Sequence, residues 1–296
     1  MNDSPLIGVG LPVALVIIMF GLGLSLTVED FRRVARSPRA VLVALALQML
    51  VLPALAFGLV VAFDLDPLLA VGVMLLAASP GGTTANLFSH LFRGDVALNV
   101  TLTAINSVLA AVSIPLITNV SISYFDAEGE LGLQFAKVLQ VIAIVVIPVA
   151  VGMLVRRRSA DFAARADRPV RAFSIVVLVL VAVGALLAER DNLGEYLQQV
   201  GLVTGLFCLA SLSIGYAGAR LLRLSEAQAI ASSMEVGIHN TTVALTIALS
   251  VLDSTEVAIP AAVYSILMYI LATTFGFAIT RSRRAGAASP EPHPTR

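Results

Sequence analysis

Nine long apolar stretches divide the sequence, and they limit the folds open to it. A helix needs about 20 mostly apolar residues to cross the hydrocarbon core of a membrane. The stretches cover residues 6–27, 40–63, 67–91, 96–120, 133–155, 172–189, 199–222, 226–251 and 257–280. They are apolar on every side, whereas the strands of a membrane barrel alternate apolar and polar residues. We therefore expect an all-α polytopic membrane protein with nine transmembrane helices, whose backbone groups bond within each helix.

Composition argues against several other classes of protein. The chain is 58% hydrophobic and 13% charged, whereas soluble domains are about 45–50% apolar and about 25% charged. Cys208 is the single cysteine, which excludes a disulfide framework or a cysteine-based metal cluster. The 19 lysines and arginines balance the 19 acidic residues, so there is no net basic field for nucleic acid.

The charges between the apolar stretches predict an orientation. Seventeen of the 19 lysines and arginines lie in the C-terminal tail and in the loops after the first, third, fifth and seventh stretches. By the positive-inside rule, the N-terminus is expected outside and the C-terminus in the cytoplasm, with the chain in the plasma (inner) membrane. We expect one transmembrane domain over 1–284 and a disordered cytoplasmic tail over 285–296. The first stretch lacks a positively charged leader, so we expect it to be retained.

Two of the stretches are interrupted about half-way along. The third contains SPGGTTAN (79–86), and the eighth contains MEVGIHNTT (234–242). Proline and glycine disfavour a continuous helix, and the loop charges make these two helices run in opposite directions. Interrupted helices in inverted repeats are typical of secondary transporters. We therefore expect repeats over about 6–120 and 133–280, although Pro80 and its neighbours could also form a simple packing kink.

Polar groups at such interruptions can bind ions. Carbonyls freed at the C-terminal end of a half-helix can bind a cation, and the N-terminal end of the next half favours an anion. Glu235 is the only carboxylate in the interior of a stretch, away from its ends, where a carboxylate is costly and usually functional. His239 and Gln48 could be binding residues or could be hydrogen-bonded structural residues. The same choice applies to Asn106, which could link helices by hydrogen bonds.

Several segments resemble the bile acid:sodium symporter family. They are LQMLVLP (47–53), SPGGTTANLFSHLFRGDVALNVTLT (79–103) and MEVGIHNTTVAL (234–245). The resemblance covers almost the whole chain. It implies a core domain and a panel domain, with the two broken helices crossing in the core, and nine helices with the N-terminus outside.

The resemblance also implies two sodium sites and a substrate site at this crossing. The first sodium site falls on Ala85, Asn86, Asn99, Thr103 and Glu235. The second falls on Gln48, Glu235, Val236, Ile238 and His239. The substrate contacts fall on Thr83 and Asn240. Histidine stands at 239 where glutamine is usual, and imidazole is a poor sodium ligand that can carry a proton. The second site is therefore in doubt, and a proton could replace one of the sodium ions.

We expect a sodium-coupled symporter of an organic anion, such as a bile-acid-like steroid or a small carboxylate, working by alternating access. Because the sequence offers no arginine buried within the spans, helix ends and amides would bind the anion, which favours a monoanion. The alternative is a proton-coupled carrier or a cation/proton antiporter using Glu235 and His239. An enzyme is not expected, because an H-E-x-x-H motif is absent. Besides substrate, lipid and sodium, we expect no cofactor, nucleic acid or obligate protein partner.

Overall fold

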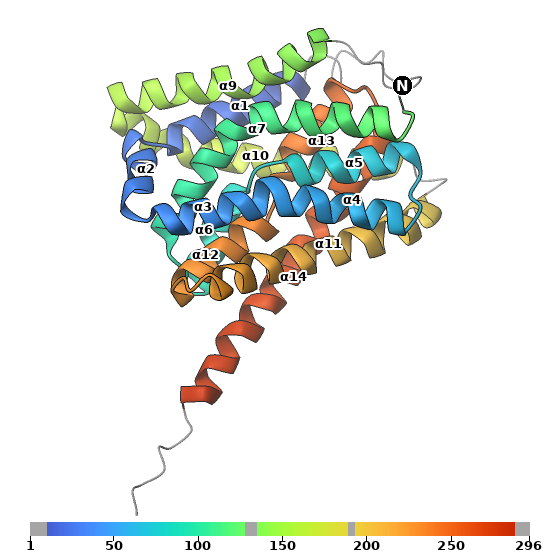
Figure 1. The fold of residues 1–296 in the computed structure, drawn as a ribbon. Helices are drawn as coiled ribbons and strands as arrows, with labels where there is room; N and C mark the ends of the chain where they lie inside the picture. The colour runs from blue at the N-terminus through green and yellow to red at the C-terminus, as the bar shows by residue number, and fades with distance from the viewer. Residues whose placement is uncertain (1–10, 128–134, 189–192, 288–296) are drawn as a thin grey trace, which may run out of the picture.

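The computed structural model describes residues 11–127, 135–188 and 193–287 (Figure 1). Within these ranges every regular element is a helix, and the one extended pairing is an isolated bridge between Gly81 and His239. The elements are α1 (Leu11–Ser25), α2 (Val28–Arg32), the 3-10 turn η2 (Arg33–Arg36), α3 (Pro38–Ala46), the π-turn η3 (Leu47–Val51), α4 (Leu52–Ala62), α5 (Pro67–Ala78), α6 (Thr83–Leu91), α7 (Val96–Tyr124), α9 (Phe135–Arg158), α10 (Ala160–Ala188), α11 (Leu193–Leu221), α12 (Glu226–Gly237), α13 (Thr241–Ser250) and α14 (Thr255–Ala287).

The helices have the length and composition of membrane helices. Among the described residues, four helical segments are long and apolar enough to cross a bilayer: Pro38–Ala62, Val96–Tyr124, Gln198–Leu221 and Thr255–Arg281. A fifth span is possible if the bent pair Pro12–Ser25 and Val28–Arg36, which meet at 66°, counts as one. The all-helical architecture of a membrane protein is therefore confirmed, whereas the number of spans is taken up below.

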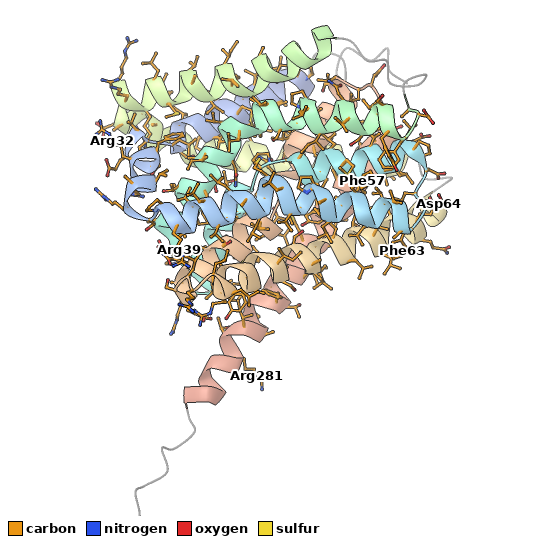
Figure 2. All side chains as sticks on the ribbon, viewed as in Figure 1. Arg32, Arg39, Phe57, Phe63, Asp64 and Arg281 are labelled. Atoms are coloured by element: carbon orange, nitrogen blue, oxygen red, sulfur yellow. The ribbon has the colours of Figure 1, made fainter. Side chains whose placement is uncertain are left out.

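Charged side chains gather at the two ends of the helix bundle. Arg32 and Arg39 lie at one end, and Asp64 lies at the other, beside Phe63 (Figure 2). The loop that contains Arg32 and Arg39 and the loop that contains Asp64 therefore lie at opposite ends of the bundle. The C-terminal part of α14 extends beyond the bundle on the arginine side (Figure 1).

Side-chain caps determine where the helices of the core begin. The carboxylate of Asp95 accepts a hydrogen bond from the backbone of Leu98 and so starts α7. Ser225 and Gln228 form a reciprocal capping box at the start of α12, which satisfies two backbone donors that a helix leaves free. The Asn240 side chain accepts from the backbone of Val243 and starts α13. Each cap fixes the position of a helix that carries polar residues.

The interruptions that the sequence predicted are present, and they contact each other. α5 ends at Ala78 and α6 begins at Thr83, while α12 ends at Gly237 and α13 begins at Thr241. The Gly82 N–H donates to the Ile238 carbonyl (2.7 Å), and the Asn240 N–H donates to the Pro80 carbonyl (2.8 Å). We call these paired segments, residues 79–82 and 238–240, the crossing.

The helix between Pro38 and Ala62 contains a π-turn over Leu47–Val51. Pro53 follows two residues later and has no N–H to continue the regular hydrogen-bond pattern. π-Turns are rare and frequently occur at functional sites. Here the π-turn carries Gln48, whose side chain is only 1% exposed and which points toward the crossing.

Two glycines allow α1 and α9 to pack closely. A Cβ atom at Gly23 would overlap the backbone of Val149, and one at Gly152 would overlap the Phe20 carbonyl. Small residues let membrane helices approach backbone to backbone.

We expect Gly152→Ala to lower the free energy of unfolding by about 1–3 kcal/mol, the usual range for overpacking. The measurement is the Tm of the purified protein in detergent. Gly201→Ala on α11 is the matched control, because nothing lies within 4 Å of a Cβ there. Equal Tm values for the two variants would contradict the close packing of α1 on α9.

Candidate ion and substrate site

A single buried carboxylate lies beside the crossing. Glu235, near the C-terminal end of α12, is 0% exposed. Its Oε2 accepts a hydrogen bond from the Thr103 hydroxyl (2.6 Å), and its Oε1 accepts from the Asn106 amide (2.8 Å). Both donors lie on α7, so the carboxylate joins α12 to α7. Two neutral donors leave its charge unneutralised, which is costly inside a membrane protein.

The absence of a side chain at Gly81 makes room for this carboxylate. A Cβ atom built on Gly81 would overlap the carboxyl group of Glu235. The break between α5 and α6 is therefore packed directly against the charged group on α12.

Amide oxygens without a donor surround the carboxylate. Asn99 donates its amide to the Ala231 carbonyl (2.8 Å), and Asn106 donates to Glu235. Because carbonyls and carboxylates only accept hydrogen bonds, these contacts fix which end of each amide is the nitrogen. The oxygens of Asn86, Asn99 and Asn106 are buried and have no hydrogen-bond partner among the described residues. Oxygen atoms of this kind are the ligands that hard cations prefer.

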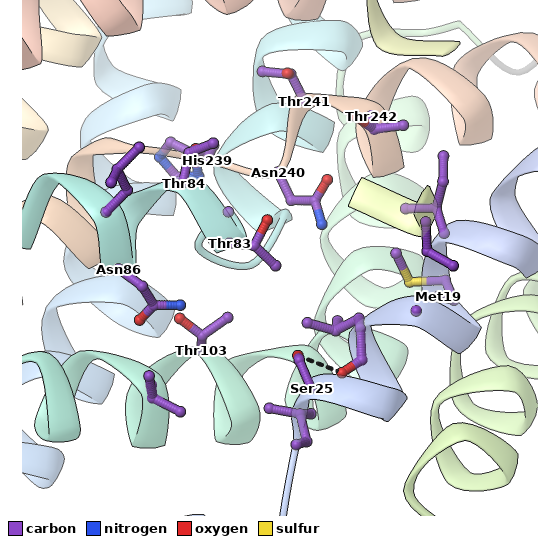
Figure 3. Close-up of a pocket in the computed structure, with 18 of the residues that line it drawn as sticks. Met19, Ser25, Thr83, Thr84, Asn86, Thr103, His239, Asn240, Thr241 and Thr242 are labelled. Atoms are coloured by element: carbon purple, nitrogen blue, oxygen red, sulfur yellow. Dashed lines mark hydrogen bonds between the residues drawn. The ribbon is translucent and has the colours of Figure 1, made fainter. Parts of the chain in front are cut away.

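These groups come together because of helix periodicity. Asn99, Thr103 and Asn106 are spaced four and three residues apart, so they share one face of α7. Asn86 comes from α6 and lies close to Thr103 (Figure 3). We call Asn86, Asn99, Thr103, Asn106 and Glu235 the oxygen cluster. The structure thus brings the residues expected at the first sodium site together. It adds Asn106, whose spacing from Thr103 was the signal that sequence reasoning left unused.

Two of the residues expected at the second sodium site, Gln48 and His239, meet at a different group, the Ser79 carbonyl. The Gln48 amide donates to this carbonyl (3.2 Å), and Nδ1 of His239 lies 3.2 Å from it. The His239 ring packs against Phe207 and Tyr264, each with a centroid 5.5 Å away, and these two rings also contact each other with centroids 5.9 Å apart. Val236 and Ile238 lie buried on the same segment, and the Ile238 carbonyl accepts from Gly82.

A cavity of about 460 Å³ opens beside the crossing. Thr83 and Asn240, the residues expected to contact substrate, both line it, as do Asn86 and Thr103 of the oxygen cluster (Figure 3). Apolar side chains of α1 such as Met19 form another wall. No lysine, arginine, aspartate or glutamate is among the described residues that line it.

Two half-helices begin at this cavity. Thr83 is the first residue of α6 and Thr241 is the first residue of α13, and both line the cavity. A helix N-terminus presents free N–H groups and about half a positive charge. The Asn240 Oδ1 caps α13, which leaves the amide N–H₂ of Asn240 available to the cavity (Figure 3). The cavity therefore favours an anionic group although no lysine or arginine is among the described residues that line it.

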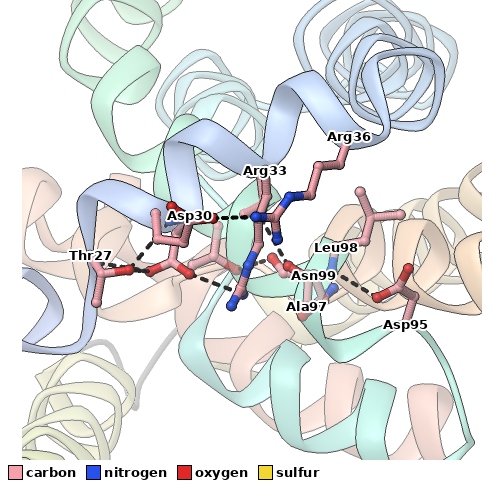
Figure 4. A network of polar contacts seen from close by, with 11 residues as sticks. Thr27, Asp30, Arg33, Arg36, Asp95, Ala97, Leu98 and Asn99 are labelled. Atoms are coloured by element: carbon pink, nitrogen blue, oxygen red, sulfur yellow. Dashed lines mark hydrogen bonds and ion pairs between the residues drawn. The ribbon is translucent and has the colours of Figure 1, made fainter.

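A second polar network lies at the arginine end of the bundle (Figure 4). Arg33 pairs with Asp30 (3.2 Å), which is itself part of a capping box with Thr27, and Arg36 pairs with Glu29 (2.8 Å). Arg33 and Arg36 line a smaller cavity of about 290 Å³ together with Asp95. Because both arginines already pair with carboxylates, we assign no ligand to this cavity.

Comparison with known proteins identifies the family. The model of the sodium bile acid symporter family matches residues 12–196. The chain belongs to this family. It is 29% identical to the uncharacterized sodium-dependent transporter YocS of Bacillus subtilis, over 92% of this chain and 84% of that protein. It is 26% identical to the ileal sodium/bile acid cotransporter of rabbit (Oryctolagus cuniculus), over 90% of this chain and 77% of that protein.

A plant relative is longer than this chain. The probable chloroplastic sodium/metabolite cotransporter BASS1 of Arabidopsis thaliana is 29% identical over 88% of this chain, which spans 64% of the plant protein. Family membership confirms the resemblance found in the sequence. The protein is therefore a membrane protein of a sodium symporter family, and its substrate and mechanism are the subject of the next section.

Proposed function

We propose that this protein is a sodium-coupled symporter of an organic monoanion, resident in the plasma membrane. One observation carries the proposal. A buried carboxylate with unpartnered amide oxygens lies next to a cavity at which two half-helices begin. The first feature suits a cation and the second suits an anion, and they share residues.

The proposed topology is nine spans in an inverted repeat, forming one domain over 1–284 with a core and a panel, the N-terminus outside and the C-terminus inside. The pairing of Gly81 with His239 supports an offset of 158 residues between the repeats. With this offset, Thr83 and Thr84 of the first repeat are equivalent to Thr241 and Thr242 of the second. α7 is equivalent to α14, and the broken pair α5–α6 is equivalent to α12–α13. α14 continues to Ala287, and the rest of the expected disordered tail lies outside the described residues.

We place the coupling sodium in the oxygen cluster. The ion would neutralise Glu235, and Asn86, Asn99, Thr103 and Asn106 offer neutral side-chain oxygens around it. Ala85, which the family resemblance also places here, is fully buried and can offer only its backbone carbonyl.

Shared residues explain how sodium can prepare the substrate site. Asn86 and Thr103 belong to the oxygen cluster and also line the cavity. A cation held by both would fix α6 against α7 and so fix the N-terminus of α6, where Thr83 lies. Binding of the ion first would then favour binding of the anion, and the loaded core would move against the panel in alternating access.

The charge of the cavity defines the substrate class. Each helix N-terminus contributes about half a positive charge, so the two together match about one negative charge. The described lining supplies no lysine or arginine to neutralise a second one. We therefore propose a monoanion with an apolar body, small enough for a cavity of about 460 Å³.

Uptake into proteoliposomes tests the function. Labelled cholate, pyruvate and pantoate are offered separately under an inward gradient of NaCl, with KCl as the control. Accumulation of at least one anion in NaCl only is the expected result. Equal accumulation in both salts would contradict sodium coupling. Sodium-driven proton movement with no anion uptake would indicate the cation/proton antiporter instead.

We expect Thr83→Val and Asn240→Asp to weaken substrate binding. A hydrogen bond to a charged group is worth about 1.5–3 kcal/mol, so Thr83→Val should raise the apparent KM by roughly 10-fold or more. Asn240→Asp keeps the helix cap but adds a negative charge facing the anion, so its effect should be larger. The measurement is anion uptake at varied concentration.

The control for these variants is Thr280→Val, because the Thr280 hydroxyl bonds only carbonyls of its own helix. Sodium binding should be unchanged in Thr83→Val. An unchanged KM in both cavity variants would place the substrate elsewhere.

A further inference from the structure

The crossing offers two places where a cation can meet backbone carbonyls freed at a helix end. One is the C-terminal end of α12 and the other is the C-terminal end of α5. The repeat relates the two ends, and its offset of 158 residues places Ala77 opposite Glu235. The α5 end therefore lacks a carboxylate of its own, and a cation there would depend on carbonyls and on neighbouring side chains.

Protein donors already occupy the carbonyls at the α5 end. The Ser79 carbonyl receives the amide of Gln48 and the imidazole of His239, each at 3.2 Å. The Pro80 carbonyl accepts from the backbone of Asn240 (2.8 Å), and the Ala78 carbonyl lies 3.4 Å from the hydroxyl of Ser113. Because a carbonyl only accepts, His239 must present an N–H to Ser79. These N–H and O–H groups supply the partial positive charge that a cation would otherwise bring.

The imidazole cannot easily turn away from this contact. It packs against the rings of Phe207 and Tyr264, which also contact each other, and it is only 1% exposed. The Tyr264 hydroxyl donates to the Gly237 carbonyl (2.8 Å), which holds one side of this enclosure in place. The ring therefore occupies fixed space, and its nitrogens are poor ligands for a hard cation.

The remaining ligands expected there are also engaged. The Ile238 carbonyl accepts from Gly82 (2.7 Å), and Glu235, which the two expected sites share, already belongs to the oxygen cluster. Gln48 keeps one amide oxygen without a partner among the described residues, and a single such oxygen does not make a sodium shell. The oxygen cluster, in contrast, contains three unpartnered amide oxygens and the carboxylate.

We propose that this chain binds one coupling sodium per cycle, in the oxygen cluster, and that His239 and Gln48 replace a second cation by donating N–H groups to Ser79. This proposal rests on the proposed function, because it counts the ions used by that symporter. It differs from the arrangement of two sodium sites that the family resemblance implies. The difference arises because residue 239 is histidine where glutamine is usual.

The test is equilibrium binding of radiolabelled sodium to the purified full-length protein in detergent, at one fixed pH. Four proteins are compared: wild type, His239→Gln, Glu235→Gln and His293→Gln. The last makes the same substitution in the C-terminal tail and is the matched control. The Tm of each protein in choline chloride shows whether it is folded before sodium is added.

We expect one sodium per chain for wild type and for His293→Gln, two for His239→Gln, and none for Glu235→Gln. Two sodium ions in wild type would overturn the proposal. One sodium in a folded His239→Gln would overturn the role given to the imidazole. If His239→Gln folds poorly, a second measurement on wild type replaces it. That measurement is the Hill coefficient of sodium-dependent thermal stabilisation. A value of one is expected, and a value near two would overturn the proposal. No sodium bound by wild type would instead refute the proposed function.

Discussion

Glu235→Gln is expected to abolish the response of the protein to sodium. The change keeps the size of the side chain and removes its charge, which is the only carboxylate charge in the oxygen cluster. A ligand that binds only the folded state stabilises it by about 2.7 kcal/mol at 100 times its Kd. We therefore expect the wild-type Tm to rise with NaCl and not with KCl or choline chloride, and the Glu235→Gln Tm to stay flat in all three salts.

The matched control for this variant is Glu29→Gln at the arginine end of the bundle. Glu29 is 42% exposed and pairs with Arg36, and such exposed pairs contribute little to stability. Glu29→Gln should therefore keep the full sodium response. A Glu235→Gln protein that is still stabilised specifically by sodium would show that the ion binds elsewhere. In proteoliposomes, sodium-driven anion uptake should be lost with Glu235→Gln and kept with Glu29→Gln.

Gly81→Ala is expected to have the second largest effect. Its Cβ would overlap the carboxyl group of Glu235, and that group is held from the other side by Thr103 and Asn106. Either the carboxylate or the crossing must move, and a shift of either disturbs the oxygen cluster. We expect the variant to lose its sodium-specific stabilisation. In choline chloride its free energy of unfolding should fall by about 1–3 kcal/mol, which is measured as a lower Tm.

Gly58→Ala on α4 is the control for Gly81→Ala. A Cβ at Gly58 meets nothing within 4 Å, and alanine favours a helix over glycine. Its sodium response should equal that of wild type. A Gly81→Ala protein with a normal sodium response would show that the break does not need to approach Glu235 closely.

Local chemistry made much of this fold predictable. The apolar stretches gave the positions of the helices, because a membrane helix must be apolar along its whole length. The break at Pro80 was predictable because proline and two glycines disfavour a helix. Glu235 stood out because it is the one carboxylate in the interior of an apolar stretch, away from its ends.

Other features depend on contacts between distant segments and could not be predicted. Nothing in LQMLV indicates that the helix widens to a π-turn at Gln48. The family resemblance predicts Gln48 and His239 as cation ligands, whereas both lie beside the carbonyl of Ser79. The sequence leaves open whether Asn106 binds a ligand or links helices, and the structure shows that it donates to Glu235. In each case the partner lies on another helix.

The balance of charge at the crossing has a consequence for energetics. At the proposed stoichiometry of one sodium ion to one monoanion, a full transport cycle moves no net charge, so the membrane potential does no net work on it. A carrier moving one extra positive charge would gain about 2.3 kcal/mol per 100 mV. With the proposed stoichiometry, the ratio of anion inside to anion outside can at most reach the ratio of sodium outside to sodium inside. A cell using this protein would keep loading substrate when its membrane is depolarised, provided that its sodium gradient persists.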